Sequence, residues 1–222
     1  MSELLASGRE ADVYALDADR VLRRYRADRD VAAEAELMAH LQRQGFPVPE
    51  VYSAHGREMV MQRVAGETLL TAIVAERISP VDAGRVLAEL HRELGRVSPL
   101  AGEGAPTDRI VHLDLHPDNV IMADAGPVLL DWSNARHGPA EFDLAVSALI
   151  LAEAAIGLHV PAIMCGPAAE TLNAFLTRAG DDVLGGLPRA VALREGNPTL
   201  SASERAQVTA ASVVVRQRVA PE

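Results

Sequence analysis

The sequence predicts an α+β fold in which a small antiparallel sheet with one helix is followed by a mostly helical part. Short apolar runs separated by turn residues fill residues 4–26, which is typical of a β-meander. Apolar residues recur at helical spacing from residue 79 onward. No internal repeat or long linker interrupts the chain, so we expect one compact protein with two lobes, residues 1–63 and 64–222.

The first lobe begins with three predicted strands, at residues 4–5, 13–16 and 21–23, joined by polar turns. The spacing changes after Asp30, and a helix is predicted whose buried face carries Val31, Ala35, Met38 and Leu41 and which ends at Gly45. Pro47 and Pro49 favour an extended segment after this helix. Strands at 51–52 and 59–61 then complete the sheet.

The second lobe opens with a strong helix start at residues 79–82, where a serine hydroxyl, a proline and an aspartate follow one another. Three short β runs come next, at 110–111, 120–122 and 128–130, the last two joined by an Asp-Ala-Gly-Pro turn. We expect helices after them, over residues 141–156, 168–178 and 188–194 and from the capping pair Ser201 and Glu204 to Arg218.

Composition excludes several classes of function. The net charge of −10 argues against a nucleic-acid partner, which needs a basic face. The longest apolar stretch, residues 144–156, is too short to span a bilayer, and the first residues lack a signal pattern, so a cytoplasmic protein without a membrane partner is expected. One cysteine, Cys165, excludes an internal disulfide, and the chain has no lysine.

The segment VHLDLHPDNVIM, residues 111–122, carries the most informative pattern. Asp114 stands five residues before Asn119 in a loop that Pro117 stiffens between two β runs. VLLDW then places Asp131 at the end of the following strand. A hairpin would return Asp131 to the edge of the sheet where the loop lies. Two carboxylates and an amide oxygen suit Mg²⁺, and transfer of a phosphoryl group from ATP needs little else.

This pattern, HxDxxxxN followed by a hydrophobic strand that ends in Asp, resembles the aminoglycoside phosphotransferase and choline kinase-like family. LAELH at 87–91, GREADVY at 8–14 and GPAEFDLA at 138–145 extend the resemblance over most of the chain. It implies a bilobal protein-kinase-like fold and a kinase that moves the γ-phosphate of ATP to a hydroxyl of a small molecule. It further implies that Asp114 is the catalytic base, that His112 buttresses the loop, that Asp143 ties it down, and that Asn119 and Asp131 hold Mg²⁺.

The resemblance also implies a nucleotide-binding first lobe. Ser7 and Gly8 belong to a turn whose backbone N–H groups would face the phosphates. Residues from Gln62 to Val64 would form the hinge that pairs with adenine. Where the family has a phosphate-gripping lysine this chain has Arg23, with Arg24 as the rival register, and Glu34 is the candidate partner on the following helix.

Other functions remain open at this stage. Arg23 in place of lysine is compatible with a nucleotide-binding module that has lost catalysis. His112, Asp114 and His116 alternate, so on a continuous strand they would share one face, as in a zinc-dependent hydrolase. A protein Ser/Thr kinase is disfavoured, because no long segment separates Asp131 from Asp143.

The acceptor is the least determined part of the reaction. Acidic residues such as Asp181 and Asp182 would suit a cationic acceptor, for example an amino sugar.

Overall fold

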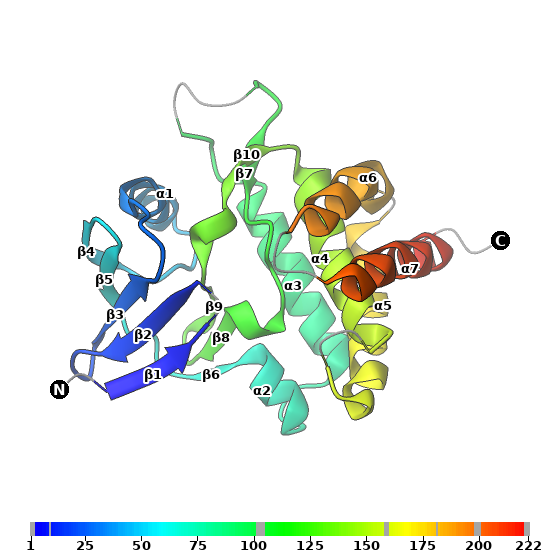
Figure 1. Cartoon of the computed structure of the whole chain (residues 1–222), viewed down its shortest axis with the longest axis horizontal. Helices are drawn as coiled ribbons and strands as arrows, with labels where there is room; N and C mark the ends of the chain where they lie inside the picture. Colours follow the sequence, from blue (N-terminus) through cyan, green and yellow to red (C-terminus); the bar gives the residue numbers. More distant parts are fainter. Residues whose placement is uncertain are drawn as a thin grey trace. The chain divides into compact units, whose positions relative to one another are not determined.

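The computed structural model describes residues 3–8, 10–100, 105–157, 160–180, 182–197 and 201–219, without the side chain of Glu204. It confirms an α+β chain with an antiparallel sheet near the N-terminus and a helical remainder (Figure 1). The chain divides into two compact units. Unit 1 comprises residues 1–67 and 121–133, and unit 2 comprises residues 68–120 and 134–222.

Unit 1 is built on a five-stranded antiparallel sheet of order β1-β2-β3-β5-β4. Its strands are β1 (Glu3–Ser7), β2 (Ala11–Ala15), β3 (Arg20–Tyr25), β4 (Val51–His55) and β5 (Glu58–Gln62). Along β3 the side chains alternate between the two faces, so that Val21, Arg23 and Tyr25 are buried and Arg24 lies on the opposite face. Arg23 therefore points into the interior of unit 1, and Arg24 points away from it.

Helix α1 (Ala32–Arg43) follows β3 as predicted, and the carboxylate of Asp30 accepts a hydrogen bond from the N–H of Ala32 at its start. Of the predicted buried face, Val31, Met38 and Leu41 are buried, and Ala35 is only half-buried. Glu34 and Leu37 are buried in addition. The burial of Glu34 was not predicted, because it depends on hydrogen-bonding partners inside the unit, which apolar periodicity cannot reveal.

A second sheet, of order β6-β8-β9, contains β6 (Glu67–Thr68), β8 (Val120–Ala123) and β9 (Gly126–Leu129). The segment after β9 packs within unit 1, where the rings of Trp132 and Phe46 meet edge to face with centroids 5.7 Å apart. Residues 121–133 thus belong to the same compact unit as the first 67 residues. In the predicted division they were part of the second lobe, residues 64–222. The predicted lobe boundary after residue 63 stays a prediction.

Unit 2 begins with α2 (Leu69–Val74), which the sequence did not predict, and α3 (Pro80–Leu94), which it did. Ser79 caps α3 by accepting a hydrogen bond from the N–H of Asp82 at 3.1 Å. Strand β7 (Arg109–Val111) pairs with β10 (Arg136–Gly138), a short strand that no sequence pattern indicated. The HxDxxxxN motif, residues 112–119, lies between β7 and β8.

The centre of unit 2 is α4 (Ala140–Ala155), which packs against the three helices that follow it, α5 (Cys165–Ala179), α6 (Asp182–Glu195) and α7 (Ala202–Val219). Its predicted burial on nearly all sides is confirmed. Helix α6 begins before the predicted 188–194 and contains Pro188. Among the described residues, no helix is both long enough and apolar enough to cross a membrane.

Candidate active site

The loop between β7 and β8 is anchored from below by Asp143 on α4. The two oxygens of this buried carboxylate accept hydrogen bonds from the backbone N–H groups of His112, at 2.9 Å, and Leu113, at 2.6 Å. Leu113 adopts φ +63°, a conformation that costs a non-glycine residue roughly 1–2 kcal/mol. Two successive N–H groups bonded to one carboxylate hold Leu113 in that conformation, and the chain direction at Asp114 is set as a result.

His91 and Ser147 complete this anchor. Nδ1 of His91 lies 3.5 Å from the Asp143 carboxylate, and its Nε2 lies 2.8 Å from the Ser147 hydroxyl, which donates to the carbonyl of Leu115. Burial by itself raises the pKa of Asp143, but the charge and hydrogen bond of His91 and the neighbouring His112 hold that pKa below its ordinary value. Asp143 is therefore an ionised anchor in the interior.

Asp114 and Asn119 meet across the loop. The side-chain amide of Asn119 donates to the Asp114 carbonyl at 2.9 Å and to its carboxylate at 3.3 Å, and lies 3.2 Å from Nε2 of His116. The 3₁₀ turn of Pro117–Asn119 creates this approach. The Asp114 side chain remains 28% exposed, so the carboxylate is fixed in place while still accessible.

His112 lies beneath the loop and is fully buried. Its Nδ1 accepts the N–H of Asp114 at 3.2 Å, so the ring supports the backbone on which the Asp114 carboxylate is mounted. The strand-like alternation that a zinc site on His112, Asp114 and His116 requires does not form, because positive φ at Leu113 interrupts it. Within the described part of the chain, no three histidine, cysteine, aspartate or glutamate residues gather where they could hold a metal.

In unit 1, Arg23 is bonded to two carboxylates. Its guanidinium lies 3.3 Å from the Glu34 carboxylate and 2.5 Å from that of Asp131. Arg24, the rival register, instead pairs with Glu58 at the surface. The charge of Asp131 raises the pKa of Arg23 against the opposing effect of burial, and burial raises the pKa of Glu34.

Two further residues complete the group that we call the Arg23 cluster (Arg23, Tyr25, Arg29, Glu34 and Asp131). The Tyr25 hydroxyl donates to Glu34 at 2.7 Å, and the guanidinium groups of Arg23 and Arg29 lie 4.8 and 4.9 Å from the centre of the Tyr25 ring. Arg29 also donates to the Ser133 carbonyl at 2.6 Å. Sequence reasoning missed both residues. The i, i+2 relation of Arg23 and Tyr25 on one strand face was the available clue to Tyr25.

The predicted phosphate turn already forms hydrogen bonds with neighbouring residues of unit 1. The Gly8 N–H donates to the Ala11 carbonyl at 2.9 Å, and the Ser7 hydroxyl bonds to Asp12 and accepts from Arg26, each at 2.7 Å. Arg9 lies outside the described residues. A role of Ser7 and Gly8 in phosphate binding stays a prediction.

The residues of the predicted hinge differ in whether their backbone N–H groups have a hydrogen-bond partner. The N–H of Gln62 donates a hydrogen bond to the Glu50 carbonyl, and the N–H of Arg63 donates to the Asp19 carbonyl. For Val64, in contrast, the described residues provide no hydrogen-bond acceptor for the backbone N–H. Val64 is therefore the better adenine-binding candidate of the two predicted positions, and both roles stay predictions.

The two groups of predicted site residues belong to different units. His112, Asp114 and Asn119 are in unit 2, and Arg23, Glu34 and Asp131 are in unit 1. The gathering of Asp114, Asn119 and Asp131 around one metal ion stays a prediction. Of the acidic pair considered for a cationic acceptor, Asp182 is exposed at the start of α6, and Asp181 lies outside the described residues.

An ethanolamine kinase, an amicoumacin kinase and a choline/ethanolamine kinase family protein are among the solved structures that share the fold of this chain. An ethanolamine kinase from Plasmodium vivax superposes with a TM-score of 0.65 at 10% identity, covering 99% of this chain and 84% of the other. An amicoumacin kinase in complex with AMP-PNP and Ca²⁺ gives 0.60 at 13%, covering 99% and 90%. A choline/ethanolamine kinase family protein from Mesorhizobium loti gives 0.58 at 16%, covering 99% and 91%. These likenesses confirm the predicted protein-kinase-like fold.

One curated relative aligns with part of the chain, a probable bifunctional tRNA threonylcarbamoyladenosine biosynthesis protein from Methanoculleus marisnigri. It is 34% identical over 103 residues, which are 46% of this chain but only 16% of the relative. The family comparison reaches further, because the phosphotransferase enzyme family matches residues 3–110 and 104–157. Because that match covers most of its length and agrees with the kinase fold, the chain belongs to the phosphotransferase enzyme family.

Proposed function

We propose that this phosphotransferase moves the γ-phosphate of ATP to a hydroxyl group of a small molecule and that Asp114 is its catalytic base. The observation that carries the proposal is the position of Asp114. Its carboxylate is accessible, yet its backbone is bonded to His112 and Asn119, and the preceding residue is bonded to buried Asp143. A carboxylate positioned so firmly can orient an acceptor hydroxyl and accept its proton as the phosphoryl group is transferred.

A divalent metal, which we take to be Mg²⁺, fits the donors that the chain provides. Among the described residues, all hydrogen bonds of the Asn119 side chain are made by its amide nitrogen. The amide oxygen of Asn119 therefore remains available as a hard ligand for the metal. Asp131 provides a carboxylate. Proteins usually provide only one or two oxygen ligands to Mg²⁺, and phosphates and water provide the others. A Mg²⁺ site therefore does not require three metal-binding side chains in one place, and the described residues contain no such group. When bound with ATP, the ion neutralises charge on the transferred group.

Arg23 takes the place of the family's lysine in this proposal. Glu34 and Tyr25 hold its buried guanidinium, and the planar, permanently charged group can contact phosphate oxygens in a bidentate manner. Ser7, Gly8, Gln62 and Val64 remain the proposed contacts to phosphate and adenine.

The decisive experiment is turnover of labelled ATP with a panel of acceptor alcohols, amino sugars and amino alcohols included. The Asp114→Ala variant should lose roughly 10²- to 10⁴-fold in kcat, the range for removal of a general base. Asp118→Asn provides the matched control, because Asp118 is an exposed carboxylate in the same loop. Equal activity of the Asp114→Ala variant and the wild type would refute the assignment of the base.

A second candidate is a nucleotide-binding module without turnover. The observation that favours it is the 2.5 Å contact between Arg23 and Asp131, because a carboxylate paired with arginine is a weaker ligand for a metal. ATP binding measured by calorimetry, together with no transfer to any acceptor of the panel, would select the module. The predicted cationic character of the acceptor and the predicted cytoplasmic location stay predictions.

A further inference from the structure

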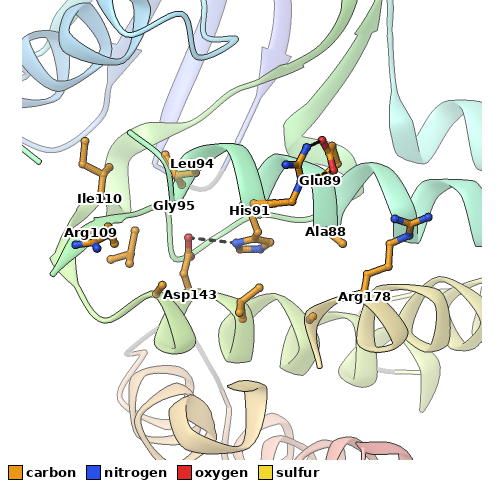
Figure 2. Close-up of a pocket in the computed structure, with 14 residues that line it drawn as sticks. Ala88, Glu89, His91, Leu94, Gly95, Arg109, Ile110, Asp143 and Arg178 are labelled. Carbon is orange, nitrogen blue, oxygen red and sulfur yellow. Dashed lines mark hydrogen bonds and ion pairs between the residues drawn. The ribbon is translucent and has the colours of Figure 1, made fainter. Parts of the chain in front are cut away.

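A cavity of about 270 Å³ lies within unit 2, bounded by α3, β7, the start of α4 and the end of α5 (Figure 2). Most of its wall is apolar, formed by Ala88, Leu94, Gly95, Ile110, Val111, Ala140, Leu144 and Ala179. Its polar lining consists of Glu89, His91, Arg92, Arg109, Asp143 and Arg178. An apolar cavity with a few polar groups is the usual form of a small-molecule site, and this one is of a size for a small metabolite.

The carboxylates of the lining are already engaged. Asp143 is only 2% exposed and is bonded to His91 and to two backbone N–H groups of the catalytic loop. Glu89 forms an ion pair with Arg92 one turn along α3. A cationic ligand would therefore find no available negative charge in this cavity.

Two arginines of the lining, Arg109 and Arg178, differ from these carboxylates in that they form no ion pair among the described residues. Among the described residues, Arg109 donates only to the backbone carbonyls of Thr107 and Asp108. Among the residues that the structure describes, no carboxylate lies within ion-pairing distance of Arg109 or Arg178. Figure 2 shows the two side chains on either side of the His91–Asp143 pair. Unpaired guanidinium groups beside an apolar wall suit a ligand that has an anionic end and an apolar body.

We propose that this cavity binds a small organic carboxylate, with its apolar body against the α3 and α4 walls and its carboxylate on Arg178 or Arg109. Such a site goes beyond phosphoryl transfer, because it makes the enzyme responsive to a second molecule. The route to the catalytic loop is short. Asp143 forms part of the cavity wall and at the same time bonds the N–H groups of His112 and Leu113, directly before Asp114. A ligand that restrains Asp143 also restrains the loop.

Binding is tested on the full chain without nucleotide, so that the result does not depend on the phosphotransfer proposal. Calorimetric titrations with butyrate, succinate and benzoate are compared with the matched amides butyramide, succinamide and benzamide. At least one carboxylate should bind, and its amide should not. Arg178→Gln and Arg109→Gln should each be compared with Arg85→Gln, an exposed α3 arginine outside the cavity. Removal of the arginine that contacts the carboxylate should weaken binding roughly tenfold or more, and the control should change nothing.

The link to the loop has its own readout, amide hydrogen exchange at His112 and Leu113 with and without the bound carboxylate. Exchange should slow in the wild type and stay unchanged when the same compound is added to the Arg178→Gln or Arg109→Gln variant that has lost binding. The site is refuted if no carboxylate binds, if the amides bind equally well, or if both arginine variants bind like the control. Binding without slower exchange would refute the link to Asp114.

Discussion

Asp143 is the residue on which the geometry of the loop between β7 and β8 depends most directly. Its carboxylate is buried and charged, and the cost of burial is offset by His91 and by two backbone N–H groups. Hydrogen bonds to a charged group contribute about 1.5–3 kcal/mol. A residue of this kind connects the pH of the solution to the conformation of a loop.

The stability of the protein should therefore fall in acid through Asp143. Its pKa is lower in the folded chain than the ordinary 3.8, so its contribution is fully present above the ordinary value and is lost as the pH falls below it, through the folded pKa. Denaturant unfolding measured from pH 6 down to pH 3 should show this loss in the wild type. In Asp143→Asn the corresponding part of the pH dependence should be absent, while Asp118→Asn should keep it. An undiminished slope in the Asp143 variant would show that other groups are responsible.

Tyr25 is the second residue whose role can be tested alone. In Tyr25→Phe the buried Glu34 carboxylate loses its 2.7 Å hydrogen bond, and the free energy of unfolding should decrease by about 1–3 kcal/mol. Tyr14→Phe is the matched control, because Tyr14 lies on the neighbouring strand β2, where the described residues provide no hydrogen bond to its hydroxyl. Equal stability of the two variants would mean that Glu34 does not need the tyrosine.

At the scale of elements, the close packing of helices depends on single glycines. A Cβ atom at Gly186 on α6 would lie closer than 3.0 Å to the Glu141 carbonyl at the start of α4. At the adjacent Gly185, the nearest atom to such a Cβ is the Glu141 Cγ, at an ordinary 3.8 Å. The same substitution should therefore have opposite effects at two neighbouring positions of one helix.

Gly186→Ala should destabilise the protein by about 1–3 kcal/mol through overpacking. Gly185→Ala should be neutral or should stabilise it by up to about 1 kcal/mol, because alanine is the better helix former. Urea unfolding of the two variants measures the difference. Equal effects at both positions would show that α6 can move away from α4 without cost.

This pair of glycines also explains why the start of α6 was missed. Gly185, Gly186 and Pro188 all disfavour a helix, so local propensity predicted only residues 188–194. The helix nevertheless begins at Asp182, since Gly186 permits contact with α4 and buried Val183 and Leu187 provide an apolar face. Tertiary packing overrides propensity in this segment. In α3 and α4 the two agree, and the start of α3 and both ends of α4 were predicted to within about two residues.

At the scale of the whole molecule, the proposed function predicts a linkage between nucleotide, metal and stability. ATP with Mg²⁺ at about 100 times its dissociation constant should stabilise the folded chain by about 2.7 kcal/mol. Removal of the metal with EDTA should reduce this stabilisation, because the phosphates would then lack their bridge to Asn119 and Asp131. Thermal unfolding with ATP, ATP–Mg²⁺ and ATP–EDTA provides the measurement. Identical melting temperatures under all three conditions would contradict the role of the metal in nucleotide binding.

The sequence by itself determined the α+β class, the capped helix α3, the buried helix α4, and the loop in which Asp114 and Asn119 meet. These features depend on periodicity, caps and spacing within a few turns of chain, and local chemistry is sufficient for them. Only the tertiary structure decided that Arg23 rather than Arg24 faces Glu34, that Glu34 is buried, and that Tyr25 and Arg29 belong to the same group. The contact between Arg23 and Asp131 joins residues 108 positions apart, and no local pattern records which distant side chain will satisfy a buried charge.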